Sequence, residues 1–307
     1  MVEHSQVRTG VVLALALVAG CANRPLRVDG AACPYMALGE TAADCPWASV
    51  ARAAAQTPSA ELPHLLEQNV PVLWQALSRD GAAPAIGRMW ARSRNADENT
   101  HTAIVQPELL AALGVEMGQD GQGDVVHAGL THTYGYLLST LRTPFGYKRA
   151  RWVSGEIERG LGLAVGLLGP MPKEGTLLAN VTCVLARLSL EVSHEEVCVS
   201  AAREVGTAKL PARLGRLVER ARSAQGVVTL RTDWFRFSAN RGLLVYSVLD
   251  SEGERLITAF PADDATWEKL TMPKTLGDNR PITTHYNAVI PGLTDSFQLG
   301  DRVVLAP

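Results

Sequence analysis

Residues 226–261, GVVTLRTDWFRFSANRGLLVYSVLDSEGERLITAFP, decide the fold class of this chain. Apolar residues and threonine dominate three runs, at residues 227–237, 242–250 and 255–261. Short turn sequences separate the runs, Asn240-Arg241-Gly242 and Ser251-Glu252-Gly253. The stretch therefore predicts three consecutive strands. Residues 283–290 and 302–305 predict two more.

Upstream of these strands the apolar spacing becomes helical. Five residues fall on one helical face, Leu62, Leu66, Val70, Leu73 and Leu77. Pro71 interrupts this face, so we expect a kink or two short helices. Residues 107–117 predict another short helix.

Three further helices are predicted before residue 226. Thr176 is expected to cap a helix whose apolar stripe is Leu177, Val181, Val184 and Leu188. Residues 193–196, Ser-His-Glu-Glu, predict a capping box that opens the next helix. Residues 210–221 carry apolar residues at helical spacing and predict an amphipathic helix. Helices that precede strands favour an α+β fold, an N-terminal helical region followed by a mainly antiparallel C-terminal sheet.

The N-terminus has the parts of an export signal. The apolar run at residues 11–18 is too short to span a bilayer, but it fits a signal peptide. Leu17-Val18-Ala19-Gly20-Cys21 resembles a lipobox, the cleavage motif of bacterial lipoproteins. The resemblance is confined to the first 21 residues. It implies that residues 1–20 are removed and that Cys21 is acylated, so that its lipid anchors the chain in a membrane. The alternative is an ordinary cleaved signal peptide, in which Cys21 has no role as a lipidation site.

The expected organisation is a signal peptide at residues 1–20, a lipidated Ala/Pro-rich tether at 21–46 and an α+β domain at 47–307, with a possible internal boundary near residue 225. Ala22, rather than Asp, after the lipidated cysteine favours the outer membrane, facing the periplasm or the surface. A net charge of -2 gives no support for nucleic-acid binding. Nucleotide-binding and serine-hydrolase motifs are absent from the sequence, so we expect no cofactor.

Four cysteines follow Cys21. An even number outside the cytoplasm favours disulfides, and the spacing suggests Cys33–Cys45 and Cys183–Cys198. Sequence alone leaves all three pairings open, and free buried cysteines are the alternative.

Residues 124–152 concentrate the side chains that could carry chemistry. Histidine, arginine and aromatic residues coincide there, and no acidic residue lies between Asp124 and Glu156. Guanidinium groups bind carboxylate or phosphate, and imidazole moves protons near neutral pH. We therefore predict acid–base residues His127, His132, Tyr134 and Asp124, and a binding set for a small anion, Arg142, Lys148, Arg149, Arg151 and His285.

Each of these residues also has a structural interpretation. His127 and His132 are five residues apart, which does not match a zinc pair on one helix, so no metal site is predicted. Residues 148–151 alternate like a solvated edge strand, and Tyr134 could be a core aromatic residue. The leading hypothesis is an envelope hydrolase or lyase acting on a small anionic component. A non-catalytic lipoprotein that binds a ligand or a partner is the alternative, and a purely structural protein is the third.

Overall fold

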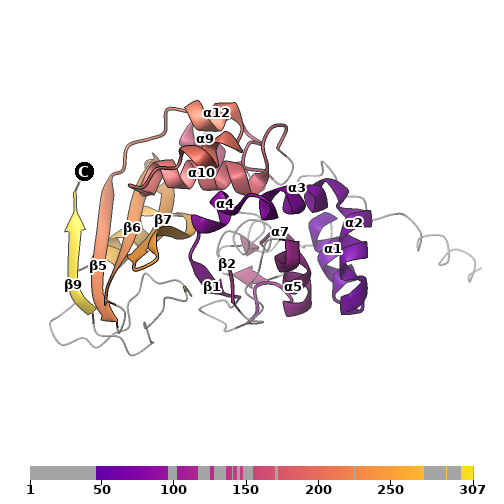
Figure 1. The fold of residues 1–307 in the computed structure, drawn as a ribbon. Coiled ribbons are helices and arrows are strands. Elements are labelled where there is room, and N and C mark those ends of the chain that lie inside the picture. Colours follow the sequence, from indigo (N-terminus) through magenta and orange to yellow (C-terminus); the bar gives the residue numbers. More distant parts are fainter. Residues whose placement is uncertain are drawn as a thin grey trace, which may run out of the picture.

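The computed structural model describes residues 46–95, 102–116, 125–127, 136–139, 141–143, 146–147, 155–169, 172–223, 226–272, 288 and 299–306. Helices dominate the first part of the chain and a five-stranded antiparallel sheet dominates the last part (Figure 1). The α+β fold expected from the sequence is confirmed. None of the helices in the described ranges is long and apolar enough to cross a membrane.

The helical part begins with short helices, most of which start at a proline residue. Pro71 separates two helices, as predicted, because α2 ends at Asn69 and α3 begins at the proline. These elements are α1 (Pro46–Ala54), η2 (Ser59–Glu61), α2 (Leu62–Asn69), α3 (Pro71–Gly81), α4 (Pro84–Arg88) and α5 (Pro107–Glu116). The predicted helix at 107–117 is therefore confirmed.

Short elements connect this part to the central helices. They are β1 (Arg92–Arg94), β2 (Val125–His127), α7 (Tyr136–Leu138), β3 (Arg142–Thr143), β4 (Gly146–Tyr147) and α9 (Glu156–Leu161). The central helices are α10 (Leu177–Ser189), α11 (Glu195–Val199) and α12 (Arg203–Thr207). Nearly every residue of α10 is buried, so α10 is the central helix of the core.

The N-terminal end of α10 is fixed by the side chain of Thr176. The Thr176 hydroxyl accepts a hydrogen bond from the Ala179 N–H at 3.1 Å, which is the predicted cap, and donates one to Asp80 of α3. The predicted next helix is present and starts at Glu195, but its N-cap is His194 and no side chain caps it. The capping box expected at Ser193 is therefore wrong.

The sheet has the strand order β8-β7-β6-β5-β9. The strands are β5 (Gly215–Ser223), β6 (Gly226–Ser238), β7 (Arg241–Asp250), β8 (Gly253–Ala262) and β9 (Leu299–Leu305). The three predicted strands and the strand at 302–305 are confirmed. Of the predicted strand at 283–290 only Ala288 is described, in an isolated bridge to Ser93.

The amphipathic helix predicted at residues 210–221 is wrong, because β5 occupies most of that segment. Leu217 and Ala221 lie on one face of β5 with the buried carboxylate of Glu219 between them. Glu219 accepts a hydrogen bond from Arg302 of β9 at 3.2 Å. An acidic residue at a buried position hid the two-residue period, so the spacing resembled a helix.

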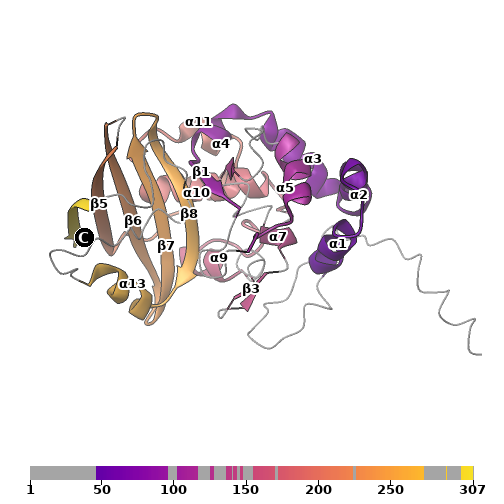
Figure 2. The ribbon, with the colours of Figure 1, turned by 90° about the horizontal axis from the view of Figure 1, so that it is seen from below.

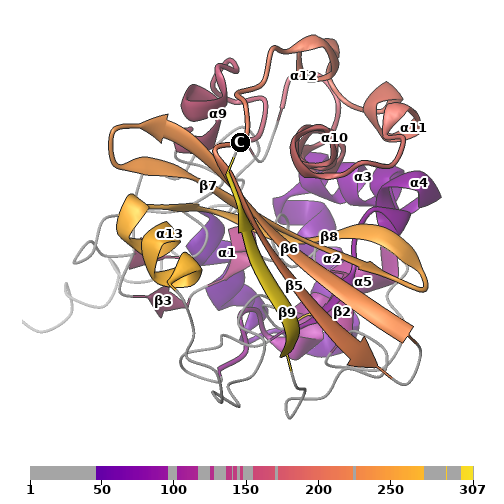
Figure 3. The ribbon, with the colours of Figure 1, turned by 90° about the vertical axis from the view of Figure 1, so that its left-hand side faces the viewer.

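Two hydrophobic clusters cover the two faces of the sheet. One joins Phe235, Val245 and Leu256 to the helices around α10. The other packs Trp234 and Tyr246 against α13 (Asp264–Thr271), whose Trp267 stacks on Trp234. Figures 2 and 3 show α10 and α13 on opposite sides of the sheet. Among the described residues, the helices around α10 therefore pack on one face of the sheet and α13 packs on the other.

The Cys183–Cys198 disulfide is present and joins α10 to α11. This is one of the two bridges that the cysteine spacing suggests. Cys33 and Cys45 lie outside the described residues.

Replacing both bridged cysteines, Cys183→Ser with Cys198→Ser, is expected to lower the free energy of unfolding by about 3 kcal/mol, because the bridge closes a short loop in the unfolded chain. Urea unfolding of the wild type under oxidising conditions and of the double variant measures the difference. Reduced wild type serves as the control and should match the variant. Equal urea midpoints for the variant and oxidised wild type would contradict the expectation.

Candidate functional site

The structure describes only parts of the segment that the sequence singles out. His127 ends β2, and its Cα lies opposite that of Arg92 in β1. Arg142 begins β3, opposite Tyr147 of β4. The remaining predicted residues lie outside the described ranges, Asp124, His132, Tyr134, Lys148, Arg149, Arg151 and His285, as does the lipidation site Cys21.

Strand β1 connects two distant parts of this predicted site. Its central residue, Ser93, pairs with Val126 of β2 and also forms an antiparallel bridge with Ala288. Val126 precedes His127, and Ala288 follows His285 by three residues. The pairing therefore brings the backbone of the 125–127 segment and of residue 288 to the two sides of one short strand.

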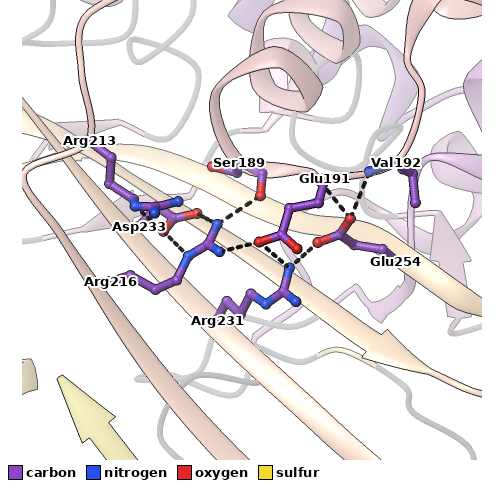
Figure 4. Close-up of polar contacts among 8 residues, drawn as sticks. All are labelled: Ser189, Glu191, Val192, Arg213, Arg216, Arg231, Asp233 and Glu254. Atoms are coloured by element: carbon purple, nitrogen blue, oxygen red, sulfur yellow. Dashed lines mark hydrogen bonds and ion pairs between the residues drawn. The ribbon is translucent and has the colours of Figure 1, made fainter. Parts of the chain in front are cut away.

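A second set of charged side chains is described in full, where the sheet meets the end of α10 (Figure 4). It comprises three guanidinium groups and three carboxylates, Arg213, Arg216, Arg231, Glu191, Asp233 and Glu254. We call this set the arginine–carboxylate cluster. The two strands β5 and β6 place Arg216 directly opposite Asp233, and alternation along each strand points both side chains to the α10 face.

Arg216 is the centre of the cluster. Its Nε and Nη2 donate to the two oxygens of Asp233, at 2.7 and 2.9 Å, in a bidentate pair. Nη2 also donates to the carbonyl of Ser189 at 3.0 Å, and Ser189 is the last residue of α10. The Arg216 residue is 5% exposed and Asp233 is 0% exposed. A cation at this position also complements the negative end of the helix dipole.

The outer part of the cluster holds the loop after α10. Glu254 of β8 accepts hydrogen bonds from the backbone N–H groups of Glu191 and Val192, at 2.7 and 3.1 Å, and pairs with Arg231. The Glu191 carboxylate lies 2.8 Å from Nη1 of Arg216. The loop is therefore held by both its backbone and a side chain.

The electrostatics follow from these contacts. The hydrogen bond from Arg216 and the charge of Arg231 lower the pKa of Glu191. Burial alone would lower the pKa of Arg216, but the hydrogen bonds and charges of Asp233 and Glu191 outweigh it and raise that pKa. With three guanidinium groups and three carboxylates, the formal charges of the cluster balance.

Another buried carboxylate lies in α9. Burial raises the pKa of Glu158, against the opposing effect of its backbone hydrogen bonds. The side chain accepts from the N–H groups of Gly166 and Leu168, at 3.3 and 3.2 Å. These contacts fix the loop after α9, so Glu158 has a structural role.

Sequence reasoning missed the arginine–carboxylate cluster. A helix predicted at residues 210–221 does not bring Arg213 and Arg216 beside Asp233, which the sequence places in a strand. The signal was the position of Asp233, a charged residue between Thr232 and Trp234 inside an apolar strand. A buried charge at such a position needs a partner. Within the described ranges, no three His, Cys, Asp or Glu side chains are grouped so that they could hold a metal ion.

Comparisons with protein-family models, curated proteins and solved structures found no match to this chain.

The Asp233→Ala variant is expected to lose about 3–5 kcal/mol of unfolding free energy, because the buried Arg216 charge is left without its main partner. Asp264→Ala is the matched control. It removes a partly exposed pair with Arg236 and should cost about 0–1 kcal/mol. Chemical denaturation followed by circular dichroism measures both. Similar losses in the two variants would show that the Arg216–Asp233 pair contributes no more than a surface pair.

Proposed function

We propose that this chain is an envelope lipoprotein, anchored through lipid on Cys21, that binds a small anionic envelope component through the 124–152 segment and acts on it as a hydrolase or lyase. The sequence supplies the lipobox resemblance and the coincidence of histidine, arginine and aromatic residues. The observation that carries the site is the pairing of β1 with β2 and with Ala288.

The export part of the proposal is supported by the disulfide between α10 and α11. Disulfides persist in oxidising compartments such as the periplasm and are rare in the cytosol. A bridge inside the buried core therefore agrees with a chain that folds after export.

The site part is supported by two cross-strand pairs. The backbone register places Arg92 opposite His127 and Arg142 opposite Tyr147. Arginine can bind an anion and histidine can transfer a proton, so these residue types suit such a reaction. In this proposal His127 or His132 is the general base, and Arg142, Arg149 or Arg151 holds the anion and stabilises developing negative charge.

Anchoring is tested with Cys21→Ala. The wild type should incorporate radiolabelled palmitate and sediment with membranes, whereas the variant should do neither, because the acylated thiol is absent. Cys198→Ser, which removes a cysteine away from the lipobox, is the control and should still be labelled. Labelling of the Cys21→Ala variant would overturn the lipoprotein assignment.

Anion binding is tested with Arg142→Gln, using inorganic phosphate and succinate as probes in calorimetry. Loss of one charge-assisted hydrogen bond is expected to weaken binding by about tenfold. Arg88→Gln removes an exposed arginine that pairs with Glu196, and it should leave binding unchanged.

Catalysis is tested in the same preparation by incubating wild type and a His127→Gln/His132→Gln variant with envelope extract and comparing products by mass spectrometry. Products that depend on the histidines support the enzyme. Arg142-dependent binding without any such product would favour the non-catalytic ligand-binding protein, and absence of Arg142-dependent binding would contradict both.

A further inference from the structure

The Glu191 side chain is exposed to solvent and is also held by two arginine side chains. Its side chain is 67% exposed, yet its carboxylate lies 2.8 Å from Nη1 of Arg216 and 3.7 Å from Nη1 of Arg231. The other carboxylate on Arg216, from Asp233, is fully buried. Glu191 is therefore the one member of this pair of acids that solvent and solutes can reach.

The backbone of Glu191 does not depend on its carboxylate. Glu254 accepts the N–H groups of Glu191 and Val192, so the loop stays in place if the Glu191 side chain rotates into solvent. Exposed glutamate side chains also lose rotamer freedom when a contact holds them, which favours their release. The Glu191 carboxylate is therefore a displaceable group on a fixed loop.

Removing the Glu191 carboxylate would leave an unbalanced positive charge. Three guanidinium groups would then face only Asp233 and Glu254 (Figure 4). Nη1 of Arg216 would lose its acceptor. Arg213, whose side chain is 38% exposed, lies 3.6 Å from Asp233, its one ion-pair partner among the described residues, and its charge also acts on Glu191. This arrangement offers donors and charge to an incoming oxyanion.

The same face of the sheet extends the positive charge outward. Successive side chains along a strand alternate between its two faces, so Arg220 and Arg222 lie on the same face of β5 as Arg216. Both are exposed, and neither forms an ion pair with a described residue, although Arg220 lies opposite Asp301 in β9. Their charges favour the approach of an anion to the cluster.

We propose that Arg213, Arg216 and Arg231 form an oxyanion-binding site for a carboxylate or phosphate group of a ligand, and that Glu191 is a built-in competitor that occupies this site until the ligand displaces it. A ligand with two negative charges on one group, such as a phosphate, competes better than a single carboxylate. None of the residues of this site belongs to the 124–152 segment, and the proposal does not depend on the function proposed for that segment.

The test is the affinity of the full chain for inorganic phosphate, with succinate as the carboxylate probe, at constant ionic strength. Glu191→Gln removes the competing charge and should raise the phosphate affinity about tenfold, because a charged donor is freed for the ligand. Glu195→Gln is the matched control: it makes the same change in net charge at an exposed residue four positions away and should leave affinity at the wild-type value.

A second variant locates the binding. The double variant Glu191→Gln/Arg213→Gln should lose most of the affinity that Glu191→Gln gains. Arg213 is partly exposed, and its removal leaves no buried charge without a partner. Equal affinities for Glu191→Gln and Glu195→Gln overturn the proposal, and so does a gain that Arg213→Gln leaves intact. Repeating the series in an Arg142→Gln background separates this site from the 124–152 segment, because the effect of Glu191 should persist there even if Arg142 contributes nothing.

Discussion

The pair formed by Arg216 and Asp233 is the interaction on which the rest of the structure depends. It crosses from β5 to β6 inside the interface between sheet and helices, and both side chains are buried. The same guanidinium holds the last carbonyl of α10 through Ser189. Because α10 is the central helix of the core, the pair fixes the register of two strands and the position of the helix at once.

The opposite end of α10 shows how this arrangement is completed. Thr176 caps the helix and bonds to Asp80 of α3, and the Cys183–Cys198 disulfide joins its middle to α11. The bond from Thr176 to Asp80 links residues 96 positions apart, whereas the disulfide joins two consecutive helices. The helical part is attached to the sheet through α10 and also through the backbone of Met89 and Ala91, which hydrogen-bonds to Leu256 of β8.

An element can be predicted from sequence when the residues that determine it are close to one another along the chain. The strands at 226–261 and the break at Pro71 were predictable because turn residues and proline act locally. The strand β5 was not predictable, because its pattern includes Glu219, a buried acid that accepts a hydrogen bond from Arg302 of the distant strand β9. The candidate site was predicted from its residue composition alone. The sequence does not show that β1 pairs with both β2 and Ala288. The arginine–carboxylate cluster was missed for the same reason.

The place of β9 in the sheet has a consequence for how the protein is made. β9 pairs with β5, yet it follows every other described element along the chain. The hydrogen-bonding edge of β5 therefore stays open during synthesis until residues 299–305 emerge. An open edge can pair with other chains. A sheet that waits for a strand so far along the chain suits the export route proposed above, because the fold is then completed on the far side of the membrane.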